Sequence, residues 1–205
     1  MHRTCRNALA VLPLIVLLFS PTVGSQTPAP DDAAAEKTVP LMIGLALDTE
    51  LYTGTMYGSP PQFAVWVENV RTKEIRTIAV TEKTGKCNWR GKTECTVSLP
   101  FWVGYYNKET GTQGDPTLEK PVADAISQPT PKAEIEISTE LPAGTVWDCY
   151  IEVNVSGDYN EHFPQSLEKT QGTPTGNAQP SIVYRARIAV KEGATAEPKL
   201  IGRTE

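Results

Sequence analysis

The chain has 205 residues and a formal net charge of −5, with 24 acidic and 19 basic side chains. An acidic chain is poorly suited to nucleic acid or to an anionic membrane surface, because both carry negative charge. A chain of this length can bury a core without a metal or a disulfide framework, so a globular protein is expected.

The first 25 residues have the organisation of a secretory signal peptide. Arg3 and Arg6 precede the apolar run ALAVLPLIVLLF, and small residues then lead to a cleavage site expected after Ser25. The run is short for a membrane span, which needs about 20 apolar residues. We therefore expect a periplasmic or secreted protein that contacts a membrane only through this segment, if the segment is not cleaved. Cleavage would remove two arginines and no acid, taking the charge from −5 to −7.

Strand-like patterns dominate the rest of the chain. Residues 26–38, rich in proline, alanine and charge, are expected to form a flexible linker, and residues 39–205 a single domain. Some segments alternate apolar and polar residues, and others are rich in β-branched and aromatic residues. These patterns predict strands at 41–49, 62–69, 75–82, 95–106, 132–139, 145–156, 181–190 and 198–204. No window predicts an amphipathic helix. The pattern indicates an all-β, immunoglobulin-like two-sheet sandwich of about seven or eight strands, with a closed β-barrel as the alternative.

The connections between these strands differ in length. Residues 70–74, VRTKE, suit a hairpin turn. Two connections are too long for turns, one from about Asn107 to Pro131 and one from Gly157 to Pro180. Long loops in a compact domain are usually functional or disordered, so any binding site is expected there.

The segment CYIEVNVSGDYNEHFP, residues 149–164, joins a thiol to a polar cluster. Strand alternation places one set of side chains on an apolar face: Trp147, Cys149, Ile151, Val153 and Val155. The other face receives Asp148, Tyr150, Glu152 and Asn154. Cys149 is therefore expected to be a buried, weakly nucleophilic core residue rather than a catalytic thiol paired with His162.

The polar cluster that follows has two readings. Asp158, Asn160, Glu161 and His162, with Asp124 as a further candidate, could bind calcium or another divalent cation. Alternatively, they form a polar turn where a strand runs into a loop, because the spacing lacks the glycine and acid pattern of an EF-hand. No other cofactor is expected.

The remaining cysteines suggest a disulfide. Cys87 and Cys95 enclose CNWRGKTEC and are the near pair for an oxidising compartment, which leaves Cys149 over. No zinc-ligand spacing, nucleophile elbow, phosphate-binding glycine loop or His-Glu-x-x-His motif occurs in the chain. Glu134 and Glu136 share an outward strand face and are expected to be solvated. We therefore do not expect an enzyme.

The tryptophans are expected to pack in the core: Trp66, Trp89, Trp102 and Trp147. A minor alternative is a carbohydrate-binding surface formed by Trp89, Tyr105, Tyr106 and Tyr159.

Five segments span roughly residues 60 to 190: PPQFAVWVENVRTKEIRTIAV, LPFWVGYY, DAISQPTP, IEVNVSGDYNE and QPSIVYRARI. In this order they resemble a family of predicted periplasmic bacterial proteins catalogued as domain of unknown function 2271. The chain departs from the family pattern at Gln128-Pro129 and at Gly157. The resemblance implies an extracytoplasmic immunoglobulin-like fold, often encoded near membrane redox or iron-handling proteins, and no established enzymatic activity.

The sequence as a whole favours a non-catalytic extracytoplasmic binding or assembly module. Its partner would be a periplasmic or membrane protein, or a small ligand, and nucleic acid is not expected. The alternatives are a metal-binding accessory protein that uses the loop at 158–162 and a carbohydrate-binding module.

Overall fold

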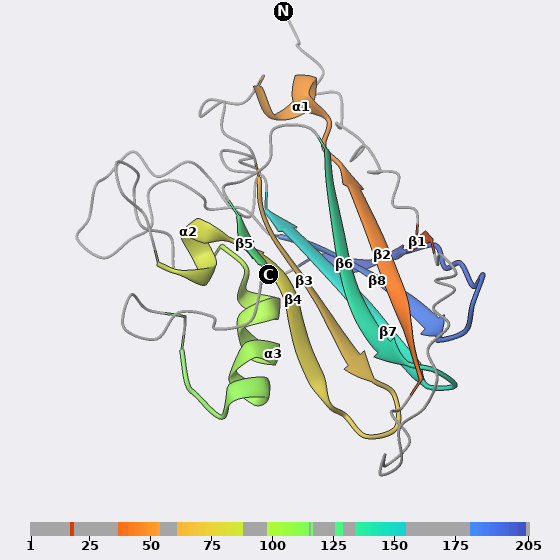
Figure 1. Ribbon diagram of the computed structural model, residues 1–205. Coiled ribbons are helices and arrows are strands. Elements are labelled where there is room, and N and C mark those ends of the chain that lie inside the picture. Colours follow the sequence, from red (N-terminus) through yellow and green to blue (C-terminus); the bar gives the residue numbers. More distant parts are fainter. Residues whose placement is uncertain are drawn as a thin grey trace, which may run out of the picture.

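The computed structural model describes residues 17–18, 37–53, 61–87, 98–114, 116, 126–128, 134–154 and 181–203 (Figure 1). Among these residues, no helix has the length and apolar character that crossing a membrane requires.

The described strands form two sheets, so the expected all-β sandwich is confirmed and the closed barrel is not found among them. The larger sheet has the order β5 (Ile126–Gln128), β4 (Ile75–Thr81), β3 (Gln62–Asn69), β7 (Val146–Asn154), β8 (Ile182–Ala189) and β9 (Lys199–Arg203). The smaller sheet has the order β1 (Leu17–Leu18), β2 (Thr38–Ala46) and β6 (Glu134–Pro142). Neighbouring strands are antiparallel, except that β5 runs parallel to β4.

Strand alternation builds the core between the two sheets. The buried set on β2 is Val39, Leu41, Ile43 and Leu45, as the sequence pattern predicts. The facing residues of the larger sheet include Phe63, Val65, Val67, Trp147, Cys149, Ile151 and Ile188. Each of these side chains is at most 4 % exposed, so this interface is the main hydrophobic core.

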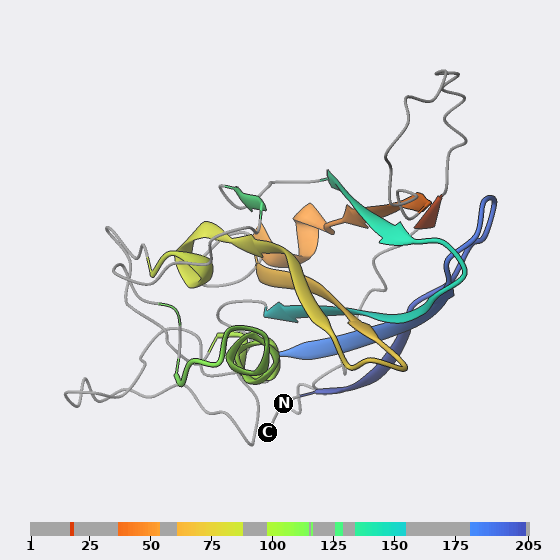
Figure 2. The same cartoon turned by 60° about the horizontal axis from the view of Figure 1, so that its bottom comes forward.

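A helix covers the opposite face of the larger sheet. Figure 2 shows three layers: β2 and β6, then the larger sheet, then helix α3 (Pro100–Thr110). A second hydrophobic cluster fills the space under the helix, formed by Ala64, Trp66, Val80, Leu99, Trp102, Tyr106, Tyr150 and Val183. Burial on both faces explains why β3 reads as a continuous apolar run rather than as an alternating one.

The prediction of a strand at 95–106 and of no helix is wrong. Residues 100–110 form α3, with Pro100 in the first turn and Gly111 in the left-handed conformation (φ 69°) just after the last turn. Proline at a helix start and glycine just past its end are common helix boundaries. The aromatic and β-branched residues between them favour strand on propensity, and packing against the sheet overrides that preference.

The hairpin predicted at residues 70–74 is confirmed. β3 and β4 pair antiparallel, and the Asn69 side-chain oxygen accepts the backbone N–H groups of Arg71 and Thr72, both at 2.9 Å. Lys73 takes a left-handed backbone (φ 65°) that closes the turn. A local side-chain acceptor of this kind is a usual device for ordering a turn.

The long connection predicted from about residue 107 to residue 131 is shorter than expected. Residues 107–110 belong to α3, and residues 126–128 form β5 beside β4. Two short helices complete the described elements, α1 (Thr49–Thr53) after β2 and α2 (Glu82–Gly85) after β4.

Candidate functional site

The residues expected to bind a cation lie outside the described part of the chain: Asp124, Asp158, Asn160, Glu161 and His162. Cys95, Trp89 and Tyr159 also lie outside it, so the disulfide of Cys87 with Cys95 stays a prediction. Within the described ranges, no group of three or more His, Cys, Asp or Glu side chains is placed to hold a metal ion.

Cys149 lies in the core, as the strand alternation predicts. Its side chain is 1 % exposed and belongs to the cluster between the sheets. Burial raises the pKa of its thiol to about 12, with a smaller contribution from the nearby charge of Asp148. A thiol that stays protonated and enclosed by hydrocarbon is a poor nucleophile. Cys149 therefore serves as a packing residue of the hydrophobic core.

The opposite face of β7 was expected to be a polar face and is in fact buried. Asp148, Tyr150, Glu152 and Asn154 are at most 6 % exposed, because α3 and the neighbouring strands enclose this face. Sequence alternation sorts the side chains of a strand into two faces but does not reveal whether something covers the polar one.

Glu152 is the most consequential residue on this face. Its Oε2 accepts the backbone N–H of Trp102 at 2.6 Å, and its Oε1 accepts the backbone N–H of Phe101 at 3.2 Å. Ser181, directly before β8, donates its hydroxyl to Oε1. The helix has no capping bond from its own N-cap residue, Leu99, so Glu152 satisfies the free N–H groups of its first turn from a strand.

The surroundings of Glu152 have opposing effects on the pKa of its carboxyl group. Burial raises the pKa of Glu152 to about 7, against the lowering effect of the bonds from Ser181, Trp102 and Phe101. A carboxyl group that titrates near neutrality is common in active sites. Here, however, both oxygens are engaged and the side chain is fully buried, so the group is arranged to hold the fold rather than to reach a substrate.

Other buried polar side chains extend from Glu152 across the same end of the larger sheet. Thr81 donates its hydroxyl to Gln62 at 2.7 Å, and Gln62 lies opposite Asn154 in the strand register. The Asn154 amide donates to the backbone oxygen of Ser98 at 2.8 Å. We call this group the polar end; its members are Gln62, Thr81, Thr84, Ser98, Glu152, Asn154 and Ser181.

The polar end holds both ends of one connection and one end of each of two others. Gln62 follows residues 54–60, Ser98 follows residues 88–97, and Asn154 and Ser181 stand on either side of residues 155–180. Each of these boundary residues is at most 2 % exposed and makes a hydrogen bond within the polar end. The four boundary residues are thus held by burial and hydrogen bonds at one end of the larger sheet.

A cluster of aromatic rings lies between α3 and the larger sheet. The Trp66 ring stacks on Tyr150, with centroids 5.3 Å apart and planes 8° apart, and contacts Phe101 and Tyr105. Offset stacking of this kind stabilises packing beyond the buried area alone. The predicted core role is confirmed for the three described tryptophans, which are fully buried: Trp66, Trp102 and Trp147.

Two residues of the carbohydrate surface suggested by the sequence, Tyr105 and Tyr106, belong to this packing. The ring of Tyr106 is 5 % exposed and is not open as a flat platform. Tyr105 is partly buried and packs against Trp66 and Tyr150. Burial and the neighbouring Tyr150 hydroxyl raise the pKa of Tyr105. The two described members of that set therefore serve the interface between the helix and the sheet.

A charged pair borders the aromatic cluster. Arg187 donates two hydrogen bonds to Asp148, at 2.8 and 2.9 Å, across the register of β7 and β8. These bonds from Arg187 lower the pKa of Asp148. Bidentate pairing of this geometry fixes the position of both side chains.

A scan against protein-family models found no match for this chain, and neither the curated proteins nor the solved structures gave one. The resemblance to periplasmic proteins of unknown function therefore stays a prediction.

Proposed function

We propose that the protein is a non-catalytic extracytoplasmic binding module. Its sandwich would hold the connections at the polar end for contact with a periplasmic or membrane protein, or with a small ligand. The observation that carries this proposal is the arrangement of the polar end, where Gln62, Ser98, Asn154 and Ser181 are buried and hydrogen-bonded at the boundaries of three connections.

Fixed boundaries matter because binding loops lose conformational freedom when they engage a partner. A scaffold that restrains the ends of a loop lowers that loss, and binding loops on rigid β-sandwiches use this principle. Cys149 and Glu152 are the two described residues considered above as possible catalytic groups. The burial of both side chains favours a binding role over a catalytic one. Cys149 is enclosed by the core, and both oxygens of Glu152 are occupied by fold-stabilising bonds.

Site-specific photo-crosslinking in the producing cell tests the proposal. A photoreactive residue at Gln165, within the connection at 155–180, should give a defined adduct with a partner. The same residue at Thr72, in the exposed turn at the opposite end of β3, is the matched control and should give none. Adducts that are equal from both positions, or absent from both, would contradict the proposal.

Two further measurements separate the alternatives. Turnover of ester, glycoside or peptide substrates that is lost in the His162→Ala variant would show an enzyme instead. A rise in melting temperature with calcium, zinc, copper or iron that His162→Ala abolishes would favour the metal-binding accessory protein, because a ligand bound only to the folded state stabilises it. The family resemblance implies a partner among membrane redox or iron-handling proteins.

A further inference from the structure

Each of the two sheets ends in a strand whose outer edge has no strand partner among the described residues. β9 is the last strand of the larger sheet, and β6 is the last strand of the smaller one. An open edge presents backbone N–H and C=O groups that can pair with another strand. What each edge can accept then depends on the side chains along it.

The β9 edge is basic and apolar. Lys199 lies opposite Arg185 in the register of β8 and β9, so both are on one face, and both are exposed. Neither has an ion-pair partner within the described part of the chain. Leu200 and Ile201 are 54 % and 44 % exposed and are the two most exposed large hydrophobic side chains described. Exposed apolar residues on an edge strand mark an interaction surface when nothing covers them.

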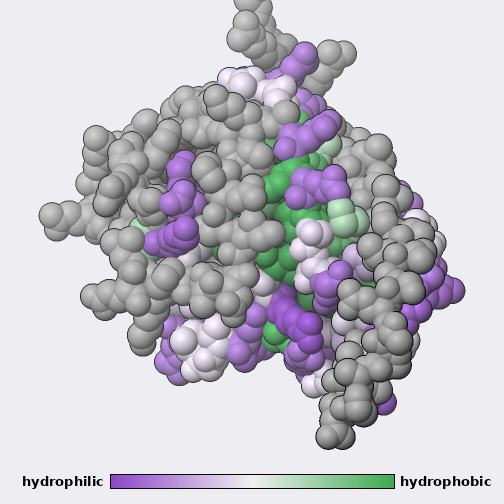
Figure 3. Space-filling view, viewed as in Figure 1, coloured by the Kyte–Doolittle hydropathy of each residue, from purple (hydrophilic) through white to green (hydrophobic). Residues whose placement is uncertain are grey.

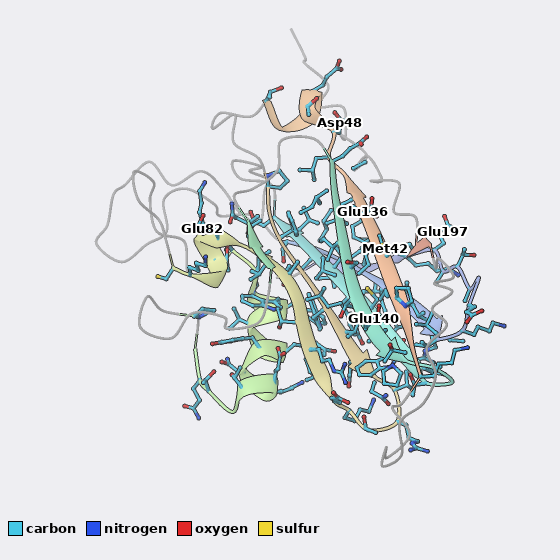
Figure 4. The ribbon with its side chains drawn as sticks, in the orientation of Figure 1. Met42, Asp48, Glu82, Glu136, Glu140 and Glu197 are labelled. Atoms are coloured by element: carbon cyan, nitrogen blue, oxygen red, sulfur yellow. The ribbon has the colours of Figure 1, made fainter. Side chains whose placement is uncertain are left out.

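The β6 edge is acidic on one face and apolar on the other. Glu134, Glu136 and Glu140 are exposed on the face that points away from the larger sheet, as the sequence predicts for the first two. Figure 4 shows Glu136 and Glu140 following one another along β6. Ile137 is buried in the core on the inner face, and Ile135 packs against that core while only partly buried. In the same orientation, Figure 3 shows hydrophobic surface among the hydrophilic residues of this side.

The two edges are complementary to each other, and we propose that β9 of one copy pairs with β6 of a second copy. In this arrangement Lys199 lies beside the row of glutamates, and Leu200, on the other face of β9, lies beside Ile135. Cross-strand pairs of opposite charge and of apolar side chains are the units that stabilise added strands. The combined sheet would bury Leu200, whose exposure in the single chain is otherwise unexplained.

Charge also selects this pairing over the symmetric ones. Two β9 edges would bring lysine and arginine residues together, and two β6 edges would bring glutamates together, and like charges on neighbouring strands destabilise a pair. The preferred contact therefore joins two different edges. Such a contact leaves one β9 and one β6 edge free in a pair of copies, so it adds further copies until they form an open chain or close into a ring.

Sedimentation velocity of the purified protein with charge-reversal variants tests this proposal. The unaltered protein should form oligomers that grow with concentration and dissociate as salt screens the charges. Lys199→Glu replaces the lysine of the β9 edge by an acid that faces the glutamates, and Glu136→Lys weakens the acidic row of β6. Each variant alone should therefore associate roughly tenfold more weakly or worse. An equimolar mixture of the two variants should recover association, because each variant supplies the edge that fits the altered edge of the other.

Lys191→Glu is the matched control, because it reverses an exposed lysine just after β8 and away from the β9 edge. It should associate like the unaltered protein, and circular dichroism should show that all variants are folded. A protein that stays monomeric at every concentration, or a mixture that associates no better than the single variants, would overturn the proposal. Loss of association in Lys191→Glu as well would reveal an effect of total charge only.

Discussion

The Glu152 carboxylate lies 2.6 Å from the backbone nitrogen of Trp102, although the two residues are 50 positions apart in the chain. A strand residue thus performs the capping that the sequence next to the helix does not supply. At the other end of α3, Glu109 accepts the backbone N–H of Thr77 at 2.8 Å and also its hydroxyl. The helix is therefore fastened to the sheet by a carboxylate near each end.

The first prediction concerns pH. The folded-state pKa of Glu152 is about 7, above the ordinary value of 4.5, so the folded protein holds this proton more tightly than the unfolded chain does. The stability that this group contributes is therefore fully present below about pH 4.5 and is lost as pH rises through about 7, by at most about 3 kcal/mol. Urea unfolding from about pH 5 to about pH 8 should show stability falling across this window.

The Glu152→Gln variant is the control for this effect. It retains a polar side chain of the same size but cannot titrate, so its stability should vary much less over the same pH range. An unchanged pH slope in this variant would show that another group is responsible.

The second prediction concerns the reactivity of Cys149. Its thiol should resist alkylation in the folded protein, because it is 1 % exposed and its pKa is raised to about 12. Denaturant should make it react readily, which peptide mass mapping after brief labelling would show. The Cys149→Ser variant should lose about 1–3 kcal/mol of stability, because it places a hydroxyl among hydrocarbon side chains. Rapid labelling in native buffer would contradict the assignment.

The third prediction compares two glycines of the same helix region. Gly104 lies within α3, and a Cβ added there would meet nothing within 4 Å, so Gly104→Ala should stabilise the protein by about 0.5–1 kcal/mol. Gly111 has φ 69°, so Gly111→Ala should destabilise by about 1 kcal/mol. Thermal unfolding of the two variants should therefore shift in opposite directions. Shifts of the same sign would mean that the helix ends elsewhere.

The fourth prediction concerns the second carboxylate that holds the helix. Glu109→Ala leaves the partly buried backbone N–H of Thr77 without its acceptor, which should lower stability by about 1–3 kcal/mol. Lys108→Ala changes the neighbouring position, where the ammonium lies 4.9 Å from the centre of the Tyr105 ring, and should lower stability less. Equal losses in the two variants would show that Glu109 has no special role.

Alternation was a reliable guide to the sandwich. The strands β3, β4, β7, β8 and β9 lie within predicted segments, because inward and outward side chains of a strand differ in burial. β2 and β6 overlap the segments predicted for them, but β2 begins earlier, at Thr38, and β6 ends later, at Pro142. The inward position of Cys149 follows from the same rule. The strands and the inward position of Cys149 depend on residues that are close together in the sequence, so the sequence pattern predicts them directly.

The helix and the polar end could not be predicted in this way. α3 contains phenylalanine, tryptophan, valine and glycine within one turn and is capped by Glu152 from a distant strand. The burial of Glu152 depends on that helix, so missing the helix meant treating the carboxylate as part of a polar strand face. The boundary residues Pro100 and Gly111 were the local signals that could have located α3.

The distance along the chain between α3 and the carboxylate that caps it bears on the order in which the protein acquires its structure. A helix of 11 residues is too short to be stable by itself in water. During synthesis, residues 100–110 leave the ribosome before β7 exists, and they gain their cap only when β7 pairs with β3. We therefore expect α3 to form late, as a consequence of sheet assembly, and a peptide of residues 98–114 alone to be largely unfolded.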